Sequence, residues 1–338
     1  MINRRRVLQT SGVAALVTVV GIAPSRAETR KLRVSLQFGI GYLQLMVMRE
    51  QKLVEKHARE AGLGDIEVEW TRLSGTTTTQ DALIANQLDI VAGGLTGLLI
   101  IWDKTRNNIG VKGVASLPTA PMVLMVRNPN IKTIRDFTDT DRIAMPQAKS
   151  GPQATVLQMA AEKEWGPGQQ GRLDELMISR PHPDAMAAML SGGTEINAHF
   201  TNHPFIVAEA KNPNIRPILN STEFFGGPHT SAAIWSTSRF RDANPKTMAA
   251  FVAAMKEASN WINADFRRAT EFYKSTDNFR GPVEDLMPIL EDKDYLHDVT
   301  PRGTIAWAAF MQRTGTIKNA PASWQDLFLP EVHDLQGS

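Results

Sequence analysis

The chain has 338 residues, and its 37 Lys and Arg nearly balance its 35 Asp and Glu, for a formal net charge of +2. A chain of this length exceeds the usual size of one domain, so we expect two lobes with a large core. The sequence contains no Cys, which excludes disulfides, thiolate metal sites and cysteine nucleophiles.

The first 27 residues have the pattern of a secretory signal peptide. Three arginines, Arg4 to Arg6, precede a short apolar stretch, and "SRA" places a small residue, Ala27, at the expected cleavage position. "NRRRVLQ" also fits a twin-arginine export signal, and an ordinary Sec signal is the alternative. We therefore expect an exported protein that is cleaved near Ala27. Removal of this segment takes away four arginines and no acid, which leaves a net charge of −2. The mature chain then has no strong electrostatic reason to bind nucleic acid.

Apolar runs alternate with helical patterns in the first part of the mature chain. Strands are predicted at 32–38, 66–73 and 88–93. Helices are predicted at 41–62, after the threonine run of "SGTTTTQ", and at 95–104. The β-α-β order indicates a parallel sheet covered by helices. "IGVKGVASL" and "PMVLMVRNP" follow as two further strands.

The same order of elements returns from residue 142. Strands are predicted at 142–146, 173–180 and 194–200, and helices at 150–166, 182–193 and "NHPFIVAEAKN". The C-terminal third is helical and opens with Asn244 as N-cap and Pro245 at the first helical position. We predict an α/β protein with a ligand cleft between two lobes. Residues 28–120 and 240–338 form the first lobe in this prediction, and residues 121–239 form the second.

No catalytic pattern stands out. The sequence has no G-x-S-x-G, H-E-x-x-H, P-loop or Rossmann fingerprint. His199 and His203 are four residues apart, but His199 falls in a predicted strand and Pro204 follows His203, so a metal-chelating helix is not expected. Nothing resembles an assembled acid/base or nucleophilic site. We expect a protein that is not an enzyme and that carries no cofactor and no metal.

Four loops rich in small and polar residues follow predicted strands or open the second series: "QFGIGY", "SGTTTTQ", "GGLTG" and "AKSGPQAT". In open α/β sheets, ligands bind at the carboxyl ends of strands, where helix N-termini expose backbone N–H groups. Each loop alone is either a capped turn or a set of donors for a polar or anionic ligand. Thr77 and Gln80 fit a capping box, which leaves Ser74, the Gly75 amide and Thr76 as surplus donors. Four such loops on one side of the sheets favour a ligand cleft.

The ordered series of motifs resembles the periplasmic solute-binding proteins of the nitrate/sulfonate/taurine ABC-import family, which also contains thiamine-pyrimidine-precursor binding proteins. The matching segments are "LRVSLQFGIGYLQLMVMREQKLVEKH", "SGTTTTQDALIANQLDIVAGG", "AMPQAKSGPQATVLQMAAEKEWG", "PHPDAMAAMLSGGTEINAHFTNHPF" and "RFRDANPKTMAAFVAAMKEASNWI". The resemblance implies a two-lobed periplasmic-binding-protein fold of type II. It also implies a monomer that captures one small solute and delivers it to an inner-membrane permease driven by a cytoplasmic ATPase.

The resemblance also implies which residues bind the solute. By position they are Gln37, Phe38, Ser74, Gly75, Thr76, Thr77, Gly94, Leu95, Thr96, Lys149, Ser150, Gly151, His199, Phe200 and Asn202.

One segment departs from the family pattern. Sulfonate-binding members have a stretch of the form D-A-W…E-P-F where this chain has "NAHFTNHPF". The change places taurine, alkanesulfonates and nitrate in doubt, and His199, His203, His229 and Phe200 suit a pyrimidine or an aromatic carboxylate at least as well. His199 and His203 are equally well interpreted as ordinary rim or core residues. Two other functions stay open: a ligand sensor, and an enzyme like thiamine-pyrimidine synthase, against which the absence of Cys and the export signal argue.

Overall fold

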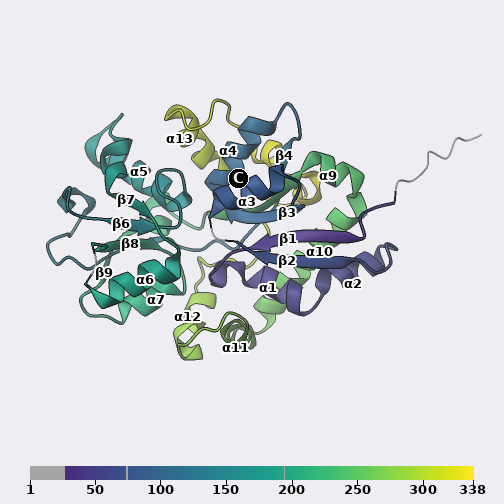
Figure 1. Cartoon of the computed structure of the whole chain (residues 1–338), viewed down its shortest axis with the longest axis horizontal. Coiled ribbons are helices and arrows are strands. Elements are labelled where there is room, and N and C mark those ends of the chain that lie inside the picture. The colour runs from purple at the N-terminus through teal and green to yellow at the C-terminus, as the bar shows by residue number, and fades with distance from the viewer. Residues whose placement is uncertain (1–26, 74, 194) are drawn as a thin grey trace, which may run out of the picture.

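The computed structural model describes residues 27–338 except 74 and 194. The predicted signal peptide up to residue 26, and with it the twin-arginine pattern, therefore lies outside the described residues, as does Ser74. Two five-stranded sheets form the centres of two lobes that lie side by side along the long axis of the molecule (Figure 1). In the part of the chain that is described, no helix is long and apolar enough to cross a membrane.

The sheet of the first lobe has the order β2-β1-β3-β10-β4. Its strands are β1 (Lys31–Leu36), β2 (Glu67–Arg72), β3 (Ile90–Gly94), β4 (Val111–Ser116) and β10 (Ala232–Thr237). β1 runs parallel to β2 and β3, whereas β10 is antiparallel to β3 and β4. Leu32, Val34 and Leu36 alternate along β1 and are fully buried, which is the pattern that predicted this strand.

Helices cover the first sheet, and most of them come from the two ends of the chain. They are α1 (Leu43–Glu50), α2 (Leu53–Glu60), α3 (Thr76–Ile84), α4 (Leu95–Thr105), α9 (Ser238–Ala243), α10 (Pro245–Ala264), α11 (Phe266–Thr276), α12 (Met287–Leu290), α13 (Thr304–Arg313) and α14 (Trp324–Leu327). The single helix predicted at 41–62 is wrong, because it divides into α1 and α2 at Lys52, which has a left-handed φ of 51°. α10 begins at Pro245 as predicted, and it packs on both α1 and α2.

The sheet of the second lobe has the order β7-β6-β8-β5-β9. Its strands are β5 (Val123–Val126), β6 (Ile143–Met145), β7 (Met177–Ser179), β8 (Ala198–Thr201) and β9 (Arg216–Asn220). Its helices are α5 (Pro152–Trp165), α6 (His182–Ser191), α7 (Phe205–Ala210) and α8 (Ser221–Phe225). The strand predicted at 173–180 is only partly correct, since a 3-10 helix over Gln170–Leu176 occupies its first half.

The chain crosses between the sheets twice, after β4 through residues 117–122 and before β10 through residues 226–231. The predicted boundary at residue 239 is therefore too late, because β10 pairs in the first sheet although it lies inside the predicted second-lobe segment. The reason is that β10 has the apolar run of a buried strand, which fits the centre of either sheet equally well. Only its partners decide which sheet it joins.

Candidate functional site

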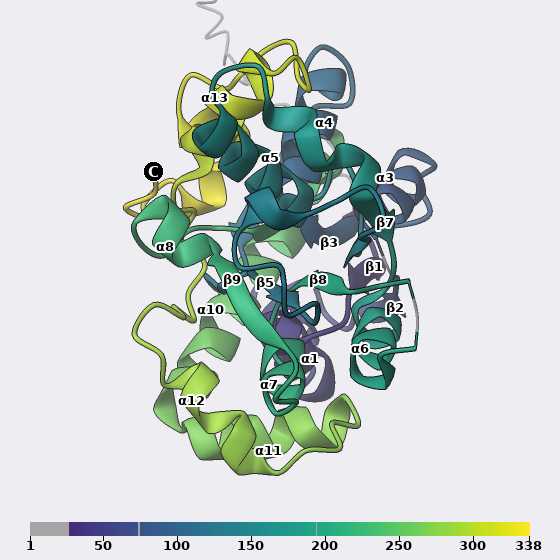
Figure 2. The same cartoon turned by 90° about the vertical axis from the view of Figure 1, so that its left-hand side faces the viewer.

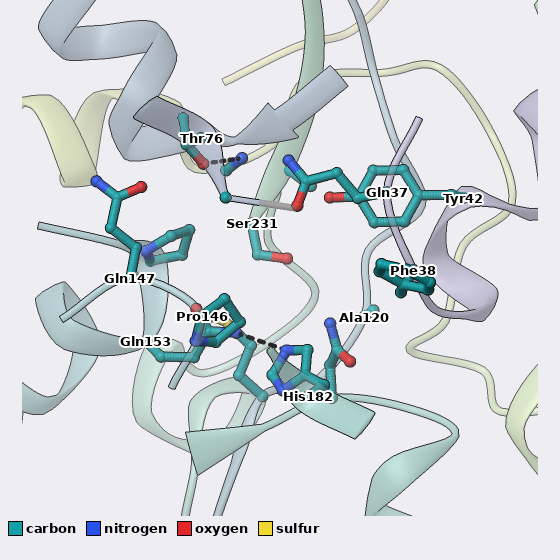
Figure 3. Close-up of a pocket in the computed structure, with 16 residues that line it drawn as sticks. Gln37, Phe38, Tyr42, Thr76, Ala120, Pro146, Gln147, Gln153, His182 and Ser231 are labelled. Carbon is teal, nitrogen blue, oxygen red and sulfur yellow. Dashed lines mark hydrogen bonds between the residues drawn. The ribbon is translucent and has the colours of Figure 1, made fainter. Parts of the chain in front are cut away.

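A cleft opens between the two lobes at the carboxyl ends of β1 and β3. Its empty volume is about 560 Å³, counting the part that is open to solvent. The lining residues come from both lobes and from both crossing segments: Gln37, Phe38, Tyr42, Gly75, Thr76, Gly94, Ala120, Met122, Pro146, Gln147, Pro152, Gln153, His182, Asn202, Ser231 and Ala232. Figure 3 shows Gln37, Tyr42 and Thr76 on one side of this space and Gln147, Gln153 and His182 on the other.

The first lobe contributes polar groups that its own backbone orients. The Thr76 hydroxyl accepts a hydrogen bond from the Gly94 amide at 3.2 Å and ties the start of α3 to the end of β3 (Figure 3). The Gln37 amide donates to the Ala92 carbonyl at 3.0 Å, which fixes this side chain at the end of β1. Tyr42 lies beside Gln37 in Figure 3, and burial raises the pKa of its hydroxyl, so it is a neutral donor at ordinary pH.

The second lobe contributes amides with unused hydrogen-bonding capacity. Gln147 donates to the Ser150 hydroxyl at 2.7 Å, and its buried Oε1 has no partner among the described residues. Asn202 likewise has a buried Oδ1 without a partner there. A buried polar atom without a partner costs free energy, so both oxygens are suited to accept a hydrogen bond from a bound molecule or water.

The charge of the cleft is close to zero. Of the described residues that line it, none is Lys, Arg, Asp or Glu. His182 is the histidine among them, and burial lowers its pKa well below the usual value, with His199 as a lesser cause. The cleft therefore offers neutral hydrogen-bonding groups and the aromatic rings of Phe38 and Tyr42, and its described lining offers no charged side chain for an ion pair.

The lobes touch at the cleft and at its two rims. Next to the cleft, the Thr96 hydroxyl donates to the Ser150 carbonyl at 2.8 Å. At one rim, Arg313 on α13 forms a two-pronged ion pair with Glu162 on α5, with N···O distances of 2.6 and 2.5 Å. At the other rim, Lys211 pairs with Asp285. In Figure 2, α13 lies close to α5 near the top of the view, and α12 lies close to α7 near the bottom.

The family model described as NMT1-like family matches residues 25–274, which is more than half of the chain. The chain belongs to the NMT1-like family. No curated protein sequence matches it.

Solved structures place this NMT1-like chain among the periplasmic binding proteins by fold. The alkanesulfonate-binding protein SsuA from Xanthomonas axonopodis pv. citri, bound to MOPS, is 18% identical over 87% of this chain and 96% of its own, with a TM-score of 0.67. The aliphatic sulphonate binding protein SsuA from Escherichia coli is 16% identical over 90% and 93%, with a TM-score of 0.65. The nitrate-binding protein NrtA from Synechocystis PCC 6803 is 15% identical over 91% and 84%, with a TM-score of 0.66. The family resemblance and the two-lobed α/β fold are thus confirmed.

The structure brings some of the predicted site residues of this NMT1-like chain to the cleft. Those that line it are Gln37, Phe38, Gly75, Thr76, Gly94 and Asn202. Ser74 lies outside the described residues, and the other predicted residues, Thr96 among them, do not line the cleft. Thr77 is exposed on α3, Leu95 is fully buried, and Lys149 pairs with Glu175 at 2.7 Å.

Four further predicted residues of the second lobe do not line the cleft. Ser150 and Gly151 form the turn before α5, where Gly151 is the N-cap residue. Phe200 is fully buried in β8. His199 also lies in β8, fully buried and bonded to His182 and Glu209, so it does not line the cleft. His182, and not His199, lines the cleft. No pattern in the sequence distinguishes His182.

The N-terminus of α3, which contains the threonine run, is capped differently from the prediction. The N-cap of α3 is Gly75, with a positive φ of 85° and no side-chain cap, so the capping box of Thr77 and Gln80 is wrong. Gln80 donates instead to the Gly97 carbonyl at 2.6 Å. Thr77 is exposed, and only Thr76 uses its hydroxyl to hold a neighbouring element.

We therefore expect the replacement of Thr76 by Val to cost about 1 kcal/mol of stability, because the Gly94 amide loses its acceptor while the side-chain volume is retained. Urea unfolding measures this change. Thr77→Val is the matched control at an exposed position of the same helix and is expected to change stability by less than about 0.5 kcal/mol. Equal losses from both variants would show that the bond between Thr76 and Gly94 contributes nothing.

Proposed function

We propose that the protein is the periplasmic solute-binding component of an ABC importer, and that its solute is a small pyrimidine-like heterocycle or aromatic carboxylate. The observation that carries the proposal is the cleft between the two lobes, which is lined by neutral amides, hydroxyls and aromatic rings. Several known proteins of this fold are named as sulfonate- or nitrate-binding proteins. A heterocycle presents alternating donors and acceptors on a flat, apolar body, which matches this lining better than a small inorganic anion does.

Export by the N-terminal signal and docking on an inner-membrane permease with a cytoplasmic ATPase belong to the same proposal. So do a monomeric state and the absence of catalysis. The solute is captured by closure of the two lobes, with 28–120 and 232–338 as the first lobe and 121–231 as the second. A solute that contacts both lobes stabilises the closed arrangement by the difference between its affinities for the closed and open states.

A thermal-shift panel tests this function. It contains taurine, MOPS, nitrate, pyrimidines such as cytosine, and aromatic carboxylates such as benzoate. A ligand that binds only the folded protein adds about 2.7 kcal/mol at a hundredfold excess over Kd, which raises Tm by roughly 3–8 °C. We expect a heterocycle or aromatic carboxylate to raise Tm and nitrate to leave it unchanged. A shift with sulfonates alone would contradict the proposed solute class, and chemical conversion of any bound compound would contradict a purely binding role.

A further inference from the structure

A chain of three buried side chains leads from the cleft into the second lobe. His182 at the start of α6 lines the cleft, and its Nδ1 lies 2.9 Å from Nε2 of His199 on β8. The opposite nitrogen of His199, Nδ1, lies 2.5 Å from Oε1 of Glu209 on α7. His199 and Glu209 are both fully buried and do not line the cleft. The three groups therefore form one continuous hydrogen-bonded path with a single end at the cleft.

Burial decides how many protons this path holds. Glu209 has a second buried oxygen without a partner among the described residues, so an ionised carboxylate there lacks compensation. Burial raises the pKa of Glu209 to about 8 and lowers the pKa of His199. At neutral pH, the pair of Glu209 and His199 therefore carries no net charge. In this state the pair holds one more proton than it would with an ionised carboxylate and a neutral ring.

Other charged groups around α7 are engaged or exposed. α7 packs against α6, β5 and β9. Asp184 on α6 is exposed, and Lys211 pairs with Asp285. The guanidinium of Arg216 on β9 donates to the backbone carbonyls of Asn128, Pro129 and Ile131. The half-buried His203 precedes α7, and burial lowers its pKa to about 4. These groups do not supply the counter-charge that a buried carboxylate needs.

A proton on Oε1 of Glu209, the oxygen that faces His199, fixes the direction of every hydrogen bond in the path. A neutral imidazole has one N–H and one acceptor nitrogen. When the Glu209–His199 pair holds the additional proton, His199 donates from Nε2 to Nδ1 of His182, and the proton of His182 is then on Nε2. When the pair loses that proton, His199 donates from Nδ1 to the carboxylate, and His182 donates from Nδ1 to His199. Nε2 of His182 is then a bare acceptor.

Nε2 is the nitrogen of His182 that lies toward the cleft. It is 3.5 Å from Nε2 of Gln153, a second lining residue (Figure 3). The amide of Gln153 can turn either its oxygen or its nitrogen toward the ring. When Nε2 of His182 changes between donor and acceptor, the amide of Gln153 can therefore turn to match it. The two side chains then change their hydrogen-bonding roles together.

We propose that Glu209 and His199 are positioning residues that make His182 a hydrogen-bond donor toward the cleft, and so select a solute that presents an acceptor, such as a ring nitrogen, a carbonyl or a carboxylate oxygen, at this wall. The selection of a solute rests on the proposed function, whereas the donor state of His182 is a property of the protein alone. The donor state of His182 and the selection of a solute can therefore be tested separately.

Nitrogen NMR of the ligand-free protein with labelled histidines tests the donor state. The spectrum of His182→Gln assigns the His182 signals. We expect His182 to carry its proton on Nε2 at pH 6.5 and on Nδ1 above about pH 8, where Glu209 loses its proton. In Glu209→Gln, no carboxyl can titrate, so the tautomer of His182 stays the same from pH 6.5 to 9.5. Glu223→Gln removes an exposed carboxyl of α8 and is the matched control, with the wild-type change retained.

Two results overturn the proposal: a wild-type His182 protonated on Nδ1 at pH 6.5, or a tautomer change that persists in Glu209→Gln. The wild-type titration decides the first even if the variant does not fold. Binding of benzoate gives the functional readout. Its affinity for wild type is expected to fall about tenfold per pH unit above pH 8 and to stay level in Glu209→Gln. An equal fall in both proteins counts against the proposal, and no benzoate binding at any pH counts against an aromatic carboxylate as the solute while the NMR result stands.

Discussion

Replacing Gly94 by alanine is expected to lower solute affinity about tenfold or more, on the order of 1.4 kcal/mol, by holding the two lobes apart. Gly94 ends β3 with φ −66° and ψ 141°, a conformation that alanine adopts without strain. A Cβ there would lie 2.5 Å from Cγ and 2.6 Å from Cδ of Pro152, at the start of α5 in the other lobe. Carbon atoms normally approach to about 3.5–4.0 Å, so the lobes must separate at this point. Calorimetry with the compound that the thermal-shift panel identifies measures the loss.

The clash can be relieved from its other side. Pro152→Ala removes both contacting carbons and is expected to reduce affinity only slightly on its own. The double variant Gly94→Ala/Pro152→Ala should recover most of the affinity, because the two substitutions act on one contact and are not additive. Ligand-free stability of Gly94→Ala is expected to stay within about 1 kcal/mol of wild type, since an open arrangement avoids the clash. Full affinity in Gly94→Ala would contradict closure at this contact.

The elements that the sequence predicted best are those with a strong local pattern. The alternation in β1 and the Asn244-Pro245 start of α10 depend only on neighbours along the chain. The break between α1 and α2 has no such signal, because Lys52 is neither Gly nor Pro and yet takes a left-handed conformation. The sheet membership of β10 also depends on partners more than a hundred residues away.

The same contrast between local patterns and distant partners applies to the residues of the cleft. Gln37, Thr76 and Gly94 could be predicted because the carboxyl ends of parallel strands meet at one edge of a sheet. Gln147 and Gln153 were missed as site residues, although Gln153 lies in the predicted loop 148–155 and Gln147 directly precedes it. Which side of a helix start faces the opposite lobe depends on how the lobes dock, and no local pattern encodes this. The predicted donors of that loop are used within the second lobe itself.

Acid is expected to unfold the protein through its buried histidines. Four of its seven histidines are buried, namely His182, His199, His229 and His297. Burial lowers the pKa of His229 and of His297 to about 4, and it lowers the pKa of the other two as well. Their folded-state pKa values lie below those of the unfolded chain, so the unfolded state binds more protons below pH 6.5. Stability is therefore lost as the pH falls through 6.5 toward 4, by about 1.4 kcal/mol per pH unit for each ring.

Glu209 acts in the opposite direction. Burial raises its pKa to about 8, so its contribution to stability grows as the pH falls from 8 toward its unfolded value near 4.5. His203, whose pKa burial also lowers to about 4, adds a fifth ring. One carboxyl offsets one ring, and roughly four rings remain, which is a net loss of about 5 kcal/mol per pH unit below pH 6.5. Against a total stability of about 5–15 kcal/mol, this places acid unfolding about one to three pH units below 6.5.

Urea unfolding between pH 8 and pH 5 measures this loss, and one ring can be isolated. His229 packs near Phe225 and Trp307, with ring-centroid distances of 4.4 and 6.1 Å, and its Nε2 has no partner among the described residues. His229→Gln is expected to lower stability at pH 8, since the ring packing is lost. It is also expected to reduce the loss of stability below pH 6.5 by about 1.4 kcal/mol per pH unit, which corresponds to one proton. His333→Gln, which replaces an exposed ring, is the matched control. A level profile for wild type would contradict the burial of neutral histidines, because each of them must otherwise gain a proton on unfolding.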